Sequence, residues 1–194
     1  MPVHKQVTNA GIYFITFTNY QWLWLLEQTK GYDLVYKWFD ILSTKQHAIN
    51  GFVIMPNHLH LLLYYAGGSQ SPNTIVGNGK RFMAYDIAKR LQGQKEESTL
   101  LKMQRGVSVK DKSRGKKHEV WEDSFDVKEC RTEKFVLQKL NYIHNNPCTQ
   151  RWKLASSPID YLHSSARFYI SGRHAGYKVK DYLEFLKFDL WDEK

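Results

Sequence analysis

The sequence lacks three features that would assign it to a familiar class. Its two cysteines, Cys130 and Cys148, have no Cys-x-x-Cys spacing and no secretory context, so we expect both to be reduced in a cytoplasmic protein. The first residues lack the apolar segment of a signal peptide. The most apolar early run, residues 22–26, is far too short to cross a bilayer, which argues against a membrane protein.

Acidic residues are also scarce. Nineteen Asp and Glu stand against 28 Lys and Arg, which gives a formal charge of +9. Such an excess favours an anionic partner, nucleic acid first and an acidic membrane surface second. No repeat or low-complexity tract divides the chain. We therefore expect one domain over residues 1–194, with a basic insertion at about 93–118 and a C-terminal extension at about 150–194.

Apolar spacing and turn residues predict an alternation of strands and helices. The expected strands are 11–18, 46–55, 58–65 and an extended segment in 119–130, and the expected helices are 20–29, 32–42, 74–92 and 132–145. This order lacks the regular βαβ alternation of a doubly wound sheet. We therefore predict an α+β fold, a ferredoxin-like or RRM-like antiparallel sheet with helices packed on one face.

His58 and His60 lie two residues apart on the strand predicted at 58–65, so both side chains leave the same face. Two neighbouring neutral imidazoles suit a divalent metal ion. The His-x-His pattern is also common by chance. A polar strand face with two solvated or hydrogen-bonded histidines explains the pair equally well when it is taken alone.

A second motif, residues 142–147 (YIHNNP), ends the helix predicted at 132–145. Tyr142 and Asn146 are four residues apart and share a helical face. A tyrosine can act as a nucleophile where a metal polarises the target phosphate, and Asn146 would add an oxygen ligand. Oxygen and imidazole ligands together suit Mg²⁺ or Mn²⁺. Singly, Tyr142 is also explained as a buried aromatic, and Asn146 as a helix-terminal residue before proline.

Together the motifs resemble those of one family. Residues 56–62 (PNHLHLL) resemble the His-hydrophobic-His motif of the HUH single-tyrosine transposases. Residues 142–147 resemble the Tyr-Ile-His-x-Asn-Pro signature of their branch known as REP-associated tyrosine transposases, and residues 161–166 (YLHSSA) are similar to a further element of that branch. The resemblance covers about residues 10–170 and implies a ferredoxin-like HUH domain.

By this resemblance His58 and His60 are metal ligands, Asn146 completes the metal site and Tyr142 is the nucleophile. The implied activity is metal-dependent cleavage and rejoining of single-stranded, hairpin-bearing DNA through a 5′-phosphotyrosine intermediate. It requires Mg²⁺ or Mn²⁺ and no nucleotide cofactor. Related insertion-sequence transposases are dimers, whereas the repeat-associated branch is monomeric, so we expect a monomer with a dimer as the alternative.

The sequence departs from the family pattern in three places. Cys148 replaces an aliphatic residue, and the basic insertion at 93–118 is longer than expected, so target recognition can differ. His144 is an alternative ligand to Asn146. His144 is two residues from Tyr142, so the two side chains leave opposite sides of the helix. This geometry favours Asn146 over His144 as the metal ligand.

Basic residues on the helix 74–92 and in the insertion are the candidates for contacts with the DNA backbone. They are Lys80, Arg81, Lys89, Arg90, Lys110, Lys112, Arg114, Lys116 and Lys117. The insertion itself has two interpretations, a solvated mobile loop or a basic arm that follows phosphates. Tyr64, Tyr65 and Trp121 are candidates for stacking on unpaired bases.

Three other functions compete with this one. A descendant of a transposase could bind hairpin DNA without cutting it, although such a binder has no need of the histidines and the tyrosine together. A metal-dependent phosphodiesterase would use the histidines with water as the nucleophile, and would retain turnover without Tyr142. A replication-type HUH nickase is disfavoured by the short chain, which has no helicase segment.

Overall fold

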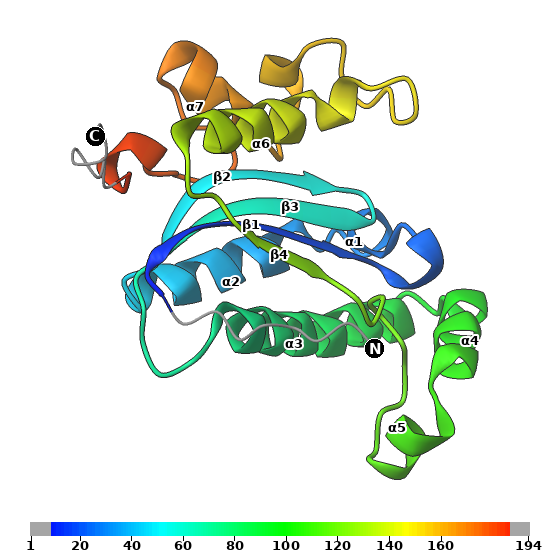
Figure 1. Ribbon diagram of the computed structural model, residues 1–194. Helices are drawn as coiled ribbons and strands as arrows, with labels where there is room; N and C mark the ends of the chain where they lie inside the picture. The colour runs from blue at the N-terminus through cyan, green and yellow to red at the C-terminus, as the bar shows by residue number, and fades with distance from the viewer. Residues whose placement is uncertain (1–8, 187–194) are drawn as a thin grey trace.

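The computed structural model describes residues 9–186, which form a four-stranded antiparallel sheet between two layers of helices (Figure 1). The strand order is β2-β3-β1-β4. The strands are β1 (Gly11–Thr18), β2 (Ala48–Met55), β3 (His58–Tyr65) and β4 (Asp126–Glu129). The histidine-bearing strand β3 is therefore central, paired along its length with β1 and β2.

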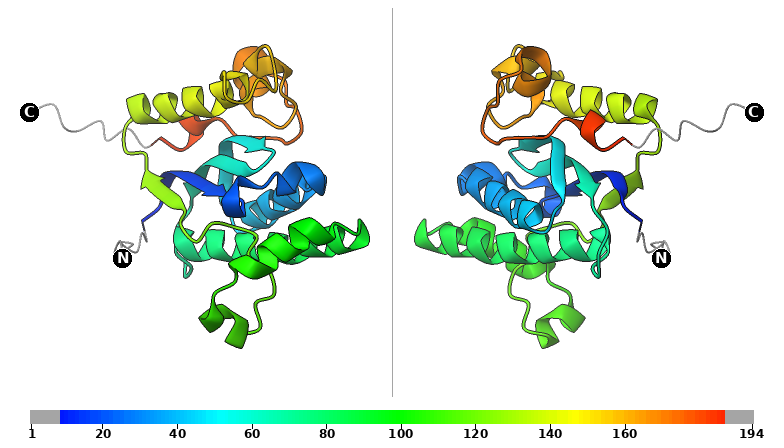
Figure 2. Two further views of the ribbon diagram at one scale, coloured as in Figure 1. Left: turned by 90° about the vertical axis from the view of Figure 1, so that its right-hand side faces the viewer. Right: turned by 90° about the vertical axis from the view of Figure 1, so that its left-hand side faces the viewer.

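One face of the sheet is covered by α1 (Leu25–Gln28), α2 (Tyr32–Thr44) and α3 (Pro72–Gly93). The other face carries α6 (Glu133–Asn145) and α7 (Ala166–Ser171) (Figure 1). Two further helices, α4 (Glu97–Gly106) and α5 (Val109–Ser113), project from the end of α3 away from the sheet (Figure 2). No helix within residues 9–186 combines the length and apolar character needed to cross a bilayer.

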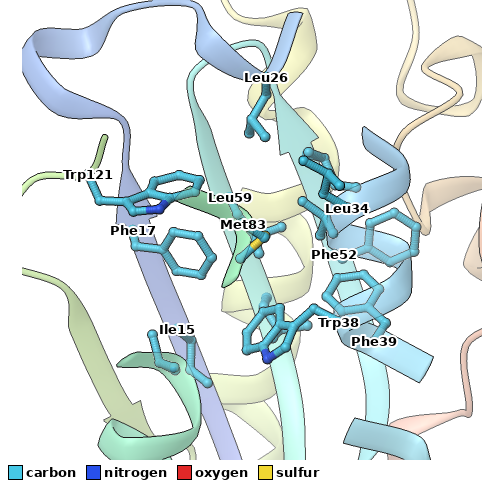
Figure 3. Close-up of a cluster of buried hydrophobic side chains, with 14 of the residues drawn as sticks. Ile15, Phe17, Leu26, Leu34, Trp38, Phe39, Phe52, Leu59, Met83 and Trp121 are labelled. Atoms are coloured by element: carbon cyan, nitrogen blue, oxygen red, sulfur yellow. The ribbon is translucent and has the colours of Figure 1, made fainter. Parts of the chain in front are cut away.

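Residues that alternate along the strands build a separate core on each face. On the α2–α3 face, Leu59, Leu61 and Leu63 of β3 pack with Phe17 and Phe52 (Figure 3). The same core includes Trp38 from α2 and Met83 from α3. The sequence predicts the antiparallel α+β fold correctly. The expectation of helices on one face is wrong, because the second face is apolar too.

The second core lies under α6. It joins Phe14, Val53 and Leu62 of the sheet to Leu140 and Ile143 of the helix. Thr132 caps the start of α6, where its hydroxyl accepts a hydrogen bond from the Phe135 backbone N–H, as the sequence predicts. The helix that carries Tyr142 is therefore seated on the face from which His58 and His60 project.

The strands predicted at 11–18 and 58–65 are confirmed, and that predicted at 46–55 begins two residues later, at Ala48. The extended segment expected in 119–130 contains β4. The turn at residues 56–57 leads directly from β2 into β3.

The helix predicted at 20–29 is wrong in its first half. Residues Tyr20–Trp22 form a 3₁₀ turn, and Gln21 and Trp22 have positive φ values of 49° and 58°, which no regular helix accommodates. The α-helix begins only at Leu25. Apolar spacing does not reveal this break, because neither residue is a glycine.

The insertion at 93–118 is more ordered than the interpretation as a mobile loop predicts. It contains α4 and α5, and Met103 of α4 is fully buried. Ser108 caps α5 by accepting a hydrogen bond from the Asp111 backbone N–H. The helical spacing of Phe82 with Ile75 and Met83 of α3 predicts a buried side chain, but Phe82 is 59% exposed. Of the amphipathic stretch expected near the C-terminus, Tyr182 is buried, while Phe188 and Leu190 lie outside the described residues.

Gly51 of β2 allows α6 to approach the sheet closely. A Cβ atom at this position would lie 2.5 Å from Leu140 Cδ2. Leu140 is itself buried, so the added methyl group must displace packed side chains. The close approach therefore depends on glycine here.

We expect Gly51→Ala to lower the free energy of unfolding by about 1–3 kcal/mol, because it overpacks the contact between β2 and α6. Gly77→Ala is the matched control. Gly77 lies within α3 with nothing near its missing Cβ, so alanine should raise stability by about 0.5–1 kcal/mol. Urea unfolding followed by circular dichroism measures both, and equal effects of the two substitutions would contradict this account.

Candidate functional site

His58 and His60 lie side by side at the start of β3, with ring centroids 4.8 Å apart. Both are buried, with exposed fractions of 3% and 4%. The pair is therefore not solvated, but both imidazoles are hydrogen-bonded, which is the other form of the structural interpretation. Their place in the fold follows from strand alternation, because Leu59 between them points into the opposite core.

The Nδ1 atom of each imidazole has a protein partner. His58 Nδ1 lies 2.7 Å from Asn57 Oδ1, and His60 Nδ1 lies 2.8 Å from Thr16 Oγ1. An amide oxygen only accepts, so His58 donates from Nδ1 and keeps a lone pair on Nε2. Imidazoles that bind metals are oriented in this manner, by a hydrogen bond from the nitrogen that does not bind the ion.

Burial also keeps the two rings neutral. Desolvation, with a contribution from the nearby Arg151 guanidinium, lowers the pKa of His58 to about 4 despite an opposing contact with Asn146. Desolvation and the neighbouring His58 hold the pKa of His60 well below its ordinary value. Both imidazoles are therefore unprotonated at neutral pH, which is the form that binds a cation.

Asn146 joins the histidines from the end of α6. Its Nδ2 lies 3.2 Å from His60 Nε2, and its side chain is buried. The Asn146 Oδ1 atom is buried without a hydrogen-bond partner. A buried oxygen in this state is unfavourable by itself, and a cation held between the amide and the imidazoles would satisfy it.

This donor set fits a hard divalent ion. Within residues 9–186 no three His, Cys, Asp or Glu side chains come together in a metal-binding group, so the set consists of two imidazoles and one amide oxygen. Mg²⁺ commonly takes few protein ligands and completes its shell with water and substrate phosphate. The residues present therefore fit the metal that the resemblance implies.

Tyr142 lies over the same site from α6. Its ring centroid is 4.9 Å from that of His60 and 6.1 Å from that of Phe14. The side chain is 50% exposed, so its interpretation as a buried aromatic is wrong. Lys139, one turn earlier, places its ammonium 4.7 Å from the Phe14 ring centroid and adds positive charge close to the tyrosine.

His144 points elsewhere. Its Nε2 lies 2.9 Å from Ser165 Oγ, and its ring packs near that of Tyr169. Ser165 also accepts a hydrogen bond from the Phe52 backbone N–H. The alternative in which His144 replaces Asn146 as a ligand is wrong, because its side chain ties α6 to β2 and to the segment before α7.

Sequence reasoning misses a group of large side chains beside His58. Trp22 comes from the loop after β1, while Arg151 and Trp152 come from the chain after α6. The ring centroids of Trp22 and Trp152 lie 5.8 and 5.2 Å from that of His58. The richness of residues 20–24 in tryptophan is the one signal that could find them, but the same apolar spacing is also typical of a helix.

Six of the nine basic residues expected to contact DNA line a groove of about 650 Å³ between α3 and residues 114–123. They are Lys80, Arg81, Lys89, Arg114, Lys116 and Lys117. The groove lies on the α3 side of the sheet, opposite α6 (Figure 1). Lys110 and Lys112 are exposed on α5.

Two of the basic residues on α3 have strong partners within the protein, and Lys116 forms an ion pair with Glu119. Arg90 makes a bidentate ion pair with Asp33, at 2.7 and 2.6 Å. Lys80 donates a hydrogen bond to the Glu122 carbonyl, and burial lowers its pKa to about 8. These contacts fix α3 to its neighbours, so both residues are poor candidates for a DNA surface.

The three aromatic residues that the sequence offers for stacking on bases, Tyr64, Tyr65 and Trp121, are not available for that role. Tyr65 and Trp121 are buried, with exposed fractions of 0% and 4%, so neither is available to a base. Tyr64 stacks on Phe185, with ring centroids 4.3 Å apart. The tryptophans beside His58 are better placed than any of them.

The fold is similar to that of a solved transposase. A solved structure of a REP-associated tyrosine transposase bound to a REP hairpin superposes with a TM-score of 0.56, at 17% identity over 93% of each chain. A putative transposase from Deinococcus radiodurans aligns with a TM-score of 0.36, at 16% identity over 75% of this chain and 97% of that one. No family model and no curated protein matches the sequence. The family resemblance of the motifs is confirmed at the level of the fold.

His144 makes the stability of the site region depend on pH. Burial lowers its pKa from 6.5 to about 4. In the unfolded chain His144 is protonated below about pH 6.5, whereas in the folded protein it is protonated only below about pH 4. The free energy of unfolding therefore falls as the pH is lowered from 6.5 to 4. At about 1.4 kcal/mol per pKa unit, the loss amounts to roughly 3 kcal/mol.

We expect His144→Gln, measured by urea unfolding between pH 7 and 4 in chelator, to lose less stability on acidification than the wild type. The amide can keep a hydrogen bond to Ser165 but does not titrate. Parallel pH profiles for the two proteins would contradict the assignment of His144 as a buried neutral imidazole.

Proposed function

We propose that this protein is a metal-dependent enzyme that cleaves and rejoins single-stranded DNA through Tyr142. The observation that carries the proposal is that two motifs distant in the chain converge on one site. Tyr142 lies against His60, and His60 lies against His58 and Asn146. A structural role for each residue alone does not require this convergence.

In the proposed reaction the Tyr142 hydroxyl oxygen forms a bond to the phosphorus of a DNA phosphodiester. The bond from phosphorus to the 3′-oxygen breaks. The phenol proton passes to solvent, and the departing oxygen takes a proton to become a 3′-hydroxyl. The product is a 5′-phosphotyrosine link. One phosphodiester replaces another, so attack by a 3′-hydroxyl can reverse the step and rejoin a strand.

His58 and His60, through Nε2, and Asn146, through Oδ1, would hold the ion, Mg²⁺ or Mn²⁺. When bound, such an ion supplies positive charge that stabilises the phosphate oxygens during displacement. Asn57 and Thr16 orient the two imidazoles, and burial keeps both imidazoles unprotonated, which is the form that binds a cation. No nucleotide cofactor is required.

The basic groove supports the choice of DNA as substrate. Arg81, Lys89, Arg114 and Lys117 are exposed along it, and Lys110 and Lys112 extend the positive surface onto α5. Contacts of this kind supply affinity for phosphates rather than sequence choice. The hairpin in the structurally similar transposase supports a hairpin-bearing strand as the target. We propose that the protein acts in the cytoplasm as a monomer.

Two alternatives predict different products from the same substrate. A hairpin-binding descendant of a transposase would bind DNA and leave it intact. A phosphodiesterase that uses water would cut DNA without a covalent link to protein. The half-exposed Tyr142 beside His60 favours the tyrosine reaction over both, because neither alternative needs a tyrosine there.

We expect wild-type protein, incubated with labelled hairpin-bearing single strands from DNA flanking its gene and Mn²⁺ or Mg²⁺, to form a covalent adduct. The adduct migrates as a protein–DNA band on a denaturing gel. Tyr142→Phe should abolish it, because the nucleophilic oxygen is removed. His58→Ala should reduce it by about 100-fold or more, on the order of the effect of removing one electrostatic group at a reacting centre.

Tyr177→Phe is the matched control, since the Tyr177 hydroxyl bonds to Asp40 of α2, outside both the site and the groove, and should leave the adduct unchanged. Cleavage that survives Tyr142→Phe without any adduct would replace this proposal with the phosphodiesterase. Binding of the cognate strand with neither adduct nor cleavage would replace it with the hairpin-binding protein.

If the basic groove binds DNA phosphates, the affinity for DNA should depend on the salt concentration through its lysines and arginines. Replacing Arg81, Lys89 and Lys117 with alanine should weaken binding of hairpin DNA, because fewer phosphates are then neutralised by the protein. The slope of log K against log salt concentration should become shallower by about one for each residue that binds a phosphate. Lys134→Ala, an exposed lysine on α6, is the control. An unchanged slope in the triple variant would remove the groove from the DNA surface.

A further inference from the structure

Two exposed tryptophans and an arginine form a cluster beside the proposed metal site. The Trp22 and Trp152 rings are close to parallel, at 25°, with centroids 6.4 Å apart. The Arg151 guanidinium lies 4.6 Å from the Trp22 centroid and 5.0 Å from that of Trp152. Trp22 is 45% exposed and Trp152 is partly exposed. We refer to these three side chains as the aromatic bracket.

The aromatic faces of the bracket suit a flat group. The Trp22 and Trp152 rings are both accessible in part, and the Arg151 guanidinium lies against both of them. Aromatic faces of this kind stack on unpaired bases of any sequence, and a guanidinium adds positive charge for the phosphate that follows.

The loop that carries Trp22 is held in an unfavourable conformation. Gln21 and Trp22 both have positive φ, and for a residue as bulky as tryptophan this is rare. Specific bonds maintain it: the Gln21 backbone N–H donates to Glu122 Oε1, and the Trp22 backbone N–H donates to the Asn19 carbonyl. Strained backbone concentrates at functional positions, because the surrounding fold must stabilise it.

Asn57 connects the bracket to the proposed metal site. Its Oδ1 accepts the hydrogen bond from His58 Nδ1, and its Nδ2 donates to the Trp22 carbonyl at 2.9 Å. One buried amide therefore sets both the orientation of a proposed metal ligand and the position of the tryptophan loop. The two sites are built as one unit.

The bracket is also continuous with the basic groove. Residues 119–123 line that groove, and the same segment bonds to the loop after β1. The Tyr20 backbone N–H donates to the Val120 carbonyl, and the Glu122 backbone N–H donates to the Thr18 carbonyl. The segment that forms one wall of the groove is therefore hydrogen-bonded to the loop that carries Trp22.

We propose that the aromatic bracket is a binding site for one unpaired nucleobase of the DNA strand, next to the phosphate that Tyr142 attacks. The base stacks on the partly exposed faces of Trp22 and Trp152, and the Arg151 guanidinium contacts the adjoining phosphate. This role rests on the proposed function, because it assigns the strand at the bracket to the substrate of that reaction. It makes Trp22 and Trp152 positioning residues for the scissile bond.

The test measures binding alone, so that it does not depend on cleavage. Tyr142→Phe protein in chelator is titrated with labelled oligothymidylate of about ten nucleotides, and with an abasic deoxyribose-phosphate oligomer of equal length and charge. We expect oligothymidylate to bind about tenfold more tightly, the effect of stacking one base. Trp22→Ala and Trp152→Leu should each remove this preference while leaving the affinity for the abasic oligomer unchanged.

Arg151→Ala separates the phosphate contact from the stacking contact. It should weaken binding of both oligomers equally and reduce the salt slope by about one, with the preference for bases retained. Trp22→Phe should keep most of the preference, because it keeps an aromatic face. Ile41→Ala, which removes an exposed apolar side chain of α2 outside the groove, is the control and should change nothing.

Each outcome decides the proposal. Loss of base preference in the tryptophan variants, confirmed as folded by circular dichroism, establishes the bracket as a base site whether or not the wild type forms an adduct. An unchanged preference in both tryptophan variants overturns it. If the wild type shows no preference for bases over the abasic oligomer but forms the adduct at Tyr142, the bracket proposal fails and the proposed reaction stands.

Discussion

The burial of β3 on both faces is the constraint on which the rest of the site depends. A central strand exposes no edge to water, so its alternating residues must satisfy two different environments. Leucines fill one core, while His58 and His60 enter the other under α6. Two imidazoles buried in this core are stable only when they are neutral and hydrogen-bonded. Asn57 and Thr16 supply the hydrogen bonds at Nδ1. The Nε2 atom of His60 faces Asn146.

The same burial explains why α6 supplies the remaining groups. Gly51 lets the helix approach the sheet, and this brings Asn146 against His60 and Tyr142 over its ring. Asn146 Oδ1 is one of three buried side-chain oxygens in residues 9–186 without a hydrogen-bond partner, with those of Asn19 and Asn50, and it is the one that lies beside His60. The site is thus closely packed around His58, His60 and Asn146 and open to solvent at the half-exposed Tyr142.

Much of this is predictable from sequence, because the signals are local. Alternation fixes the face shared by His58 and His60, and helical spacing fixes that of Tyr142 and Asn146. The second helical layer, the positive φ of Trp22 and the ordered insertion are not predictable, because they arise from contacts between distant segments. Trp121 is a clear case: the sequence leaves it a candidate for the surface, but its Nε1 donates to the Lys80 carbonyl inside the core.

The central claim is that the Tyr142 oxygen forms the covalent link, and peptide mapping of the reaction product tests it most directly. Trypsin releases Tyr142 in the peptide of residues 140–151, between Lys139 and Arg151. After nuclease digestion of the reacted protein, we predict that this peptide carries the mass of a residual nucleotide, and that fragmentation assigns the mass to Tyr142. A nucleotide on any other residue, or a free 5′-phosphate with every peptide unmodified, would contradict the account.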